Sequence, residues 1–104
     1  NAQDFANTAW AFATADVPAP QLFESIAAEA QPRLREFNAQ DFANTSWAFA
    51  TAAVPATELF EEIERAAVKR IDEFEKAGVT AMTWAFKTTG CEAPRFYEAL
   101  RHRK

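Results

Sequence analysis

The stretch NAQDFANTAWAFATADVPA, residues 1–19, returns as NAQDFANTSWAFATAAVPA at residues 38–56. Seventeen of these 19 positions are identical, and 25 of 37 positions match when residues 1–37 are aligned with residues 38–74 without a gap. A third, weaker copy covers residues 75–104 and keeps 6 of its 30 positions from the second. A fixed period of this length is typical of repeat proteins, in which each unit buries its apolar face against the next.

The repeated stretch has the pattern of an amphipathic helix. Asn1 and Asn38 stand where an N-cap is expected, and an aspartate follows each of them by three residues, as in a capping box. The pattern predicts helices over Ala2–Ala15 and Ala39–Ala52. Their apolar surface is broader than packing against a single neighbouring helix requires. We therefore expect inner helices that pack on the second helix of their own unit and on both adjacent repeats.

Prolines divide each unit into two helices. Val17 and Val54 precede prolines, and a residue in that position avoids helical geometry, so the first helices should end there. Second helices are predicted to begin at three equivalent positions, because proline is tolerated in a first turn and threonine can cap one. These positions are Pro20, Thr57 and Pro94.

The predicted ends differ between units. In the first unit the second helix should end near Ala30, with Pro32 starting a separate turn through Arg35, because proline breaks a helix interior. The second unit has no such proline, and its helix should run almost continuously to Phe74. Gly78 weakens the start of the third unit, where we expect helices over Val79–Lys87 and Pro94–Leu100.

These elements predict an all-α fold, an α-solenoid of stacked helical hairpins with 37-residue repeats. It forms one domain over residues 1–104, divided into repeats 1–37, 38–74 and 75–104, the third degenerate and incomplete. We interpret the chain as a piece of a longer array whose two ends lack the polar caps that solenoids need, so neighbouring repeats should cover both. The expected core is Phe5, Trp10, Phe12, Leu22, Phe23, Ile26 and their counterparts.

Composition excludes several classes of protein. The chain is 49% hydrophobic and 25% charged, with a net charge of −4, so it is neither disordered nor broadly basic. No apolar run reaches the length of a membrane span, and no membrane insertion is expected. One cysteine and one histidine cannot form a disulfide, a metal site or a Cys–His nucleophile, and no glycine-rich phosphate loop exists. We therefore expect no enzyme, no metal and no cofactor.

The 37-residue unit resembles the octotricopeptide repeat and its relative, the heptatricopeptide repeat. The resemblance rests on the NTAWAFA string, the Val-Pro turn, an LFxxI second helix and a closing RLxEF. It implies an organelle protein of a plastid or mitochondrion that binds RNA and acts in RNA processing, stability or translation. It further implies that the first helices line a concave binding surface beside neighbouring repeats of a longer array.

Polar residues that recur on the first helices are the candidate RNA-binding site. Amides and hydroxyls can recognise the edges of unstacked bases in single-stranded RNA. The alternative is that they only solvate an exposed face or bond neighbouring helices, and the third unit departs from the pattern. The candidates are Gln3, Asn7, Thr14, Gln40, Asn44 and Thr51.

The tryptophans Trp10, Trp47 and Trp84 form the most regular column of the chain and lie at the border of the apolar arc. Aromatic residues at helical spacing are usually core residues, and base stacking is the alternative. Two functions therefore remain open. The first is an RNA-binding module, and the second is a protein-binding scaffold or structural subunit of a large organelle assembly, which the acidic charge favours.

Overall fold

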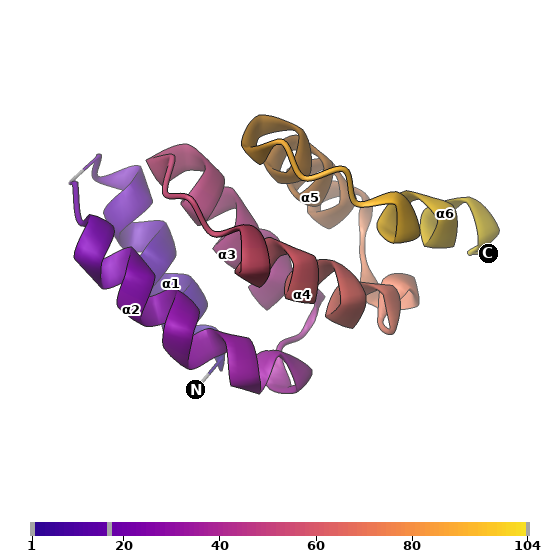
Figure 1. Ribbon diagram of the computed structural model, residues 1–104. Helices are drawn as coiled ribbons and strands as arrows, with labels where there is room; N and C mark the ends of the chain where they lie inside the picture. Colours follow the sequence, from indigo (N-terminus) through magenta and orange to yellow (C-terminus); the bar gives the residue numbers. More distant parts are fainter. Residues whose placement is uncertain (1, 17, 104) are drawn as a thin grey trace.

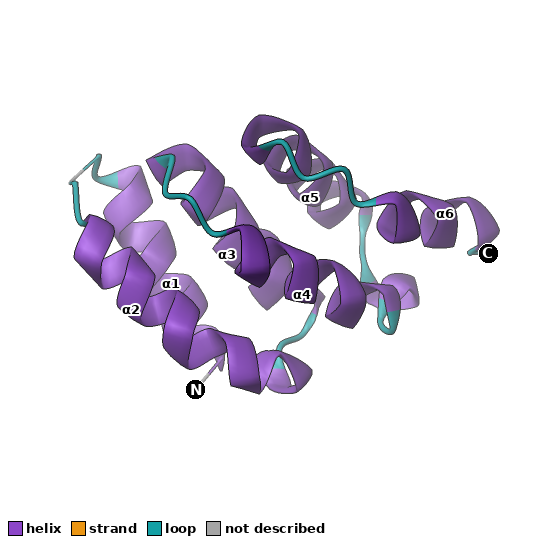
Figure 2. Ribbon diagram, viewed as in Figure 1, coloured by secondary structure: helices purple, strands orange, loops and turns teal. Residues whose placement is uncertain are grey.

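The computed structural model describes residues 2–16 and 18–103, and this part of the chain is all-helical (Figures 1 and 2). The expectations for Asn1 and Val17 lie outside the described residues. The six α-helices and two 3-10 helices of this part are α1 (Ala2–Thr14), α2 (Pro20–Ala30), η1 (Gln31–Glu36), α3 (Ala39–Ala52), α4 (Thr57–Val68), η2 (Ile71–Glu73), α5 (Lys76–Thr89) and α6 (Pro94–His102).

The helices form two layers. Helices α1, α3 and α5 lie side by side with α3 in the middle, and α2, α4 and α6 lie in front of them in Figure 1. The first helices begin at Ala2, Ala39 and Lys76, each 37 residues after the last, and the second helices begin at Pro20, Thr57 and Pro94 with the same spacing. The all-α class is thereby confirmed, and all three predicted starts of the second helices are correct.

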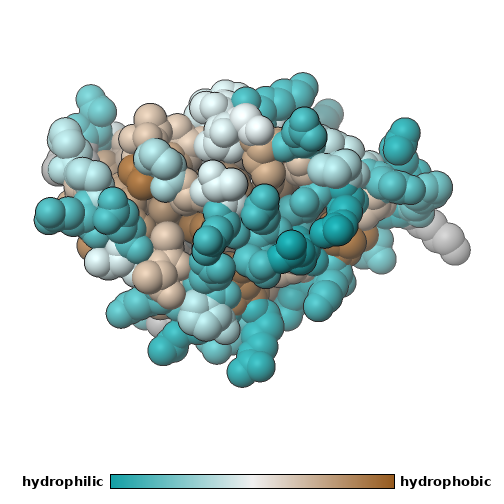
Figure 3. Space-filling model, in the orientation of Figure 1, coloured by the Kyte–Doolittle hydropathy of each residue, from teal (hydrophilic) through white to brown (hydrophobic). Residues whose placement is uncertain are grey.

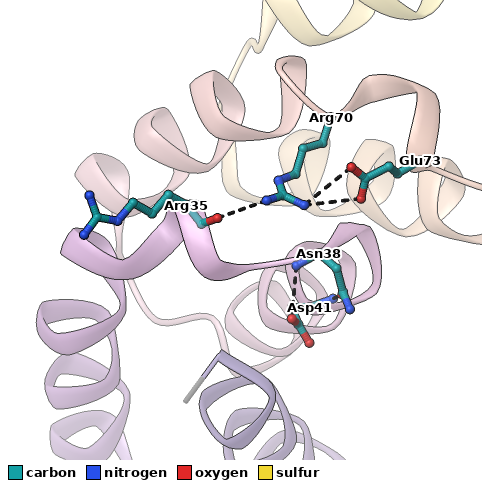
Figure 4. A network of polar contacts seen from close by, with 5 residues as sticks. All are labelled: Arg35, Asn38, Asp41, Arg70 and Glu73. Carbon is teal, nitrogen blue, oxygen red and sulfur yellow. Dashed lines mark hydrogen bonds and ion pairs between the residues drawn. The ribbon is translucent and has the colours of Figure 1, made fainter.

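Helix α3 has a defined cap at each end. The Asn38 side chain accepts a hydrogen bond from the Asp41 backbone N–H at 2.8 Å, and the Asp41 carboxylate accepts one from the Asn38 N–H at 3.1 Å (Figure 4). This is the predicted capping box. Its end is marked by Ala53 in the left-handed region, and the equivalent residues Asp16 and Gly90 share that conformation. The helix end is thus the same in all three units.

Two predicted boundaries are wrong, and the predicted ends of α1, α5 and α6 differ from the observed ones by one or two residues. Helix α4 ends at Val68 and a separate 3-10 turn follows, although no proline stands there. Helix α5 begins at Lys76 rather than Val79, because Gly78 is no obstacle in its first turn. A Cβ on Gly78 would lie 3.4 Å from the Phe74 ring, so the missing side chain lets the helix approach the closing phenylalanine of the preceding unit.

Phenylalanine rings link the three units inside the core. Phe37 lies 5.4 Å from Phe42, which lies 6.4 Å from Phe74, and Phe74 lies 5.8 Å from Phe96. The series continues through Phe86 to Phe60 with centroid separations of 5.3 and 6.2 Å. These are distances at which aromatic pairs attract beyond simple burial. The six rings, buried in every case, are named here the phenylalanine column.

The tryptophans are not core residues, which corrects the predicted core. Trp10 is 47% exposed and Trp84 is 43% exposed, while Trp47 is half-buried. Phe5, Phe12 and Leu22 of the first unit are also only partly buried. Their counterparts in the second unit, namely Phe42, Phe49 and Leu59, are buried.

Arginines tie each unit to the short 3-10 helix of the unit before it. The Arg70 guanidinium donates to the Arg35 carbonyl oxygen at 3.1 Å and also contacts Glu73 (Figure 4). Arg103 donates to the carbonyl oxygens of Ile71 and Phe74 at 2.8 and 2.7 Å. Hydrogen bonds from a charged donor are the stronger ones, so these contacts fix the turns that position Phe37 and Phe74.

A buried carboxylate begins the last helix. Glu64 on α4 is buried, and its Oε2 accepts hydrogen bonds from the backbone N–H groups of Arg95 at 2.8 Å and Phe96 at 3.2 Å. Ala93 at the N-cap position supplies no side-chain acceptor. Glu64 therefore satisfies orphan donors at the start of α6, and the positive end of the helix dipole favours its charge.

The repeat supplies a matched pair for testing the core. Phe49→Ala should lower the free energy of unfolding by about 3–5 kcal/mol, because a fully buried ring leaves a cavity. The equivalent change Phe12→Ala removes a partly exposed ring and should cost about half as much. Urea titration of both variants measures the difference. Equal losses would mean that α1 and α3 are buried alike, contrary to the structure.

Glu64→Ala should lower the free energy of unfolding by about 1.5–3 kcal/mol, the range for hydrogen bonds to a charged group, because the buried N–H of Phe96 and the part-buried N–H of Arg95 lose their acceptor. Glu61→Ala, three residues earlier on the same helix and exposed, is the control and should change it by no more than about 0.5 kcal/mol. Thermal and urea unfolding give both values. A Glu64 variant as stable as the control would show that the α6 start does not depend on this carboxylate.

Candidate functional site

One face of the α1, α3 and α5 layer carries a repeated set of twelve side chains, nine of them exposed and three half-buried. The set has four positions on each helix. Successive positions are four, three and four residues apart, so all four lie on one side of the α-helix. We name this surface the tryptophan face, since a tryptophan occupies the third position on every helix. Its members are Gln3, Asn7, Trp10 and Thr14 on α1, Gln40, Asn44, Trp47 and Thr51 on α3, and Ala77, Ala81, Trp84 and Thr88 on α5.

The middle helix shows why this face is open. Asp41, Thr45 and Ala48 on α3 are buried on the side of α1, and Ala43, Ser46 and Ala50 are buried on the opposite side, toward α5. Phe42 and Phe49 are buried against the second layer. The remaining side of α3 is therefore the one that carries Gln40 and Thr51, both exposed.

The tryptophans approach one another across the helices. The Trp10 and Trp47 rings lie 6.5 Å apart between centroids and are tilted by 34°. Trp10 and Trp84 are the large hydrophobic residues that the described part of the chain exposes. Exposed tryptophans carry a large contact area with few rotatable bonds, and they are enriched among residues that dominate binding energies.

The structure brings the six predicted site residues together on this face. Five of them are exposed, and Asn44 is half-buried. The tryptophans belong to the same surface, although the sequence pattern favoured a core position for them. The sequence does contain a pattern that predicts their exposure. Asn7 and Trp10 are three residues apart, so the tryptophan shares a side of the helix with the polar amide.

The tryptophan face contains no charged side chain among its twelve positions. Asp41, which lies beside this face on α3, is buried in its capping box. Cations lie beside the face on the outer side of α5, where Lys76 and Lys87 are exposed. The face itself therefore offers stacking and amide hydrogen bonds rather than charge.

A second polar surface was not predicted. A groove of about 640 Å³ lies between η1 and α4 and gathers basic residues from two units. Two of its cations are already paired, Arg65 with Glu62 and Arg70 with Glu73. The sequence shows these residues only as scattered charges, and folding brings Arg35, Arg65, Lys69 and Arg70 together.

A larger hollow of about 650 Å³ lies between the turn after α3 and the turn after α5. It is lined by Val54, Thr57, Glu61 and Cys91 among others. Burial raises the pKa of the Cys91 thiol, and the nearby carboxylates add to this effect against a backbone hydrogen bond at Ala93. The thiol is therefore less reactive than an exposed cysteine.

Within residues 2–16 and 18–103, no group of three His, Cys, Asp or Glu side chains is placed to hold a metal ion. No helix in the described part of the chain combines the length and apolarity that crossing a bilayer requires. From the α2, α4 and α6 side the surface is largely hydrophilic, with apolar side chains visible between the helices (Figure 3).

Comparison of the sequence with models of known protein families identifies the family of the chain. A family described as RNA-editing substrate-binding complex 6 protein matches residues 1–104, the whole chain. The chain belongs to this family. No curated protein and no solved structure matches it.

This membership corrects the resemblance to octotricopeptide and heptatricopeptide repeats, which is wrong. Helical pairs of about 37 residues with a tryptophan-alanine-phenylalanine string are therefore not specific to those repeats. The family name places the chain with components of a complex that takes part in RNA processing. The six polar site residues stay a prediction.

Proposed function

We propose that this chain is a helical scaffold, a protein-binding subunit of an RNA-editing substrate-binding complex. The family match over the whole chain carries the proposal. The 37-residue spacing of equivalent helices and the two-layer arrangement support an α-solenoid, an architecture whose extended surfaces bind partners. Of the two organelles considered, we propose the mitochondrion, because the family match to a protein of an RNA-editing complex supports it and nothing supports the plastid.

The tryptophan face is the surface that we propose contacts the protein partner. Centres of protein interfaces are depleted in charge and enriched in tryptophan, and this face has both properties. Its amides and hydroxyls, Gln3 and Asn7 for example, would supply the hydrogen bonds that such interfaces contain at moderate density. The overall charge of −4 agrees with a protein partner better than with a polyanion.

Single-stranded RNA is the second candidate ligand of the same face. The observation that favours it is the pairing of amides with aromatic rings, because bases stack on tryptophan and bond to amides. The near-identical sets on α1 and α3 would then select the same base at successive positions. Against it stands the lack of cations on the face, since phosphate contacts supply much of the affinity for RNA.

The double variant Trp10→Ala and Trp84→Ala tests the proposal. The tagged chain is purified from its own mitochondria, and the amounts of co-purifying complex subunits are measured. We expect a loss of about tenfold or more, because truncating interface tryptophans commonly costs over 1.4 kcal/mol. Glu24→Ala with Glu29→Ala, two exposed changes on α2, is the control and should retain the subunits.

Nuclease treatment separates the two candidates. If protein contacts hold the complex, removing RNA leaves the co-purifying subunits unchanged, and homopolymer RNA does not quench the fluorescence of Trp10 and Trp84. Release of the subunits by nuclease, with quenching at low salt that fades at high salt, would replace the scaffold proposal by RNA binding. Full retention by the tryptophan double variant would remove this face from either role.

A further inference from the structure

The outward side of α1 repeats a surface that is already covered elsewhere in the molecule. Thr8 and Ala11 are exposed on it. The identical residues one repeat later, Thr45 and Ala48, are 0% exposed, because α1 lies on them. The same two residues are therefore exposed on α1 and buried on α3, and the element that buries them on α3 is α1.

The covering surface has a defined chemistry. Helix α1 turns small side chains toward α3, and all of them are buried: Ala2, Ala6, Ala9 and Ala13. The rest of the first unit covers the phenylalanines of α3. Phe23 of α2 meets Phe49 edge-on at 4.9 Å, and Phe37 meets Phe42 at 5.4 Å. On α1 the equivalent rings, Phe5 and Phe12, are only partly buried.

We infer that the outward side of α1 and α2 is a docking surface for a further helical hairpin of this same kind. The occupant presents alanine or serine at the four positions equivalent to Ala2, Ala6, Ala9 and Ala13. It also presents phenylalanine at the positions equivalent to Phe23 and Phe37. Residues 38–74 meet this description, with Ala39, Ala43, Ser46, Ala50, Phe60 and Phe74 in those places.

A second copy of the present chain does not fit this surface. Its free end is the outward side of α5, where the four equivalent positions are Lys76, Thr80, Thr83 and Lys87. Docking that end on α1 would bury two ammonium groups on a surface of alanine, threonine and phenylalanine with one carboxylate, Asp4, so at least one ammonium would lose its hydration without a partner. The polar side of α5 instead resembles a cap. The outward sides of α1 and α5 therefore differ in chemistry, since the first is largely apolar and the second is polar.

The inference rests on the proposed scaffold role, and it adds the kind of partner that docks on α1 and α2. It concerns a different surface from the tryptophan face, which lies on another side of α1. Loss of docking here leaves the partner contacts of Trp10 and Trp84 intact, so the two proposals fail separately.

The test joins a copy of residues 38–74 directly in front of residue 1, which keeps the 37-residue spacing. Cys91→Ser removes the native thiol, and Ala11→Cys reports the exposure of the surface through its rate of reaction with a maleimide. In the original chain Ala11→Cys should react at close to the rate of the unfolded chain. In the extended chain it should react about 100-fold more slowly, because reaction then requires local opening of a buried interface.

The matched control carries lysines in the added copy at the positions of Ala39 and Ala50, as at Lys76 and Lys87 of α5. In this control Ala11→Cys should keep its fast reaction. The urea midpoint of the cysteine-free sequence is the second measurement, and it should rise with the added copy and rise less with the lysine copy.

Two results would overturn the inference. The first is a fast reaction of Ala11→Cys in an extended chain whose circular dichroism shows the added helices. The second is a reaction in the original chain that slows as its concentration rises, because that result would assign the surface to a second copy.

Discussion

The phenylalanine column holds the units of this protein together. Phe42 lies between Phe37 and Phe74, the closing residues of two successive units, and Phe74 in turn contacts Phe96. The contacts of Phe37 with Phe42 and of Phe74 with Phe96 join successive units, so the core continues from one hairpin into the next. At 104 residues a core of this size leaves a modest margin of stability, to which the burial of these six rings contributes.

The polar contacts serve to position these rings. Arg70 and Arg103 bind carbonyl oxygens of η1 and η2, the short 3-10 helices that precede Phe37 and Phe74. Glu64 fixes the start of α6, where Phe96 follows within the first turn. With the rings in place, the first helices line up and present their remaining sides as one repeated surface. The tryptophan face is a consequence of this stacking.

Local signals predicted much of the fold. Prolines and caps act within a few residues, so the starts of α2, α4 and α6 could be predicted from Pro20, Thr57 and Pro94. The end of α4 could not, because its sequence favours a longer helix. The chain leaves the helix at Val68 for a tertiary reason, since Phe74 has to reach Phe42 and Phe96.

The candidate site was predicted in part for the same reason. Helical spacing places Gln3, Asn7 and Thr14 on one side of α1, and that side is exposed. Spacing alone does not tell whether Trp10 at the border of the arc is covered, because that depends on where α2 and α3 pack. The basic groove between η1 and α4 joins residues of two units, and only the folded chain shows it.

Native-state hydrogen exchange in increasing denaturant tests the coupling of the units most directly. If the phenylalanine column makes them one cooperative body, the most protected amides of α3, α4 and α5 should exchange through the same opening, with free energies within about 0.5 kcal/mol of one another. The amides of Phe49, Ile63 and Phe86 are suitable probes, since all three side chains are fully buried. A lower and independent opening free energy for Phe86 than for Phe49 would contradict the account, because the third unit would then unfold without the second.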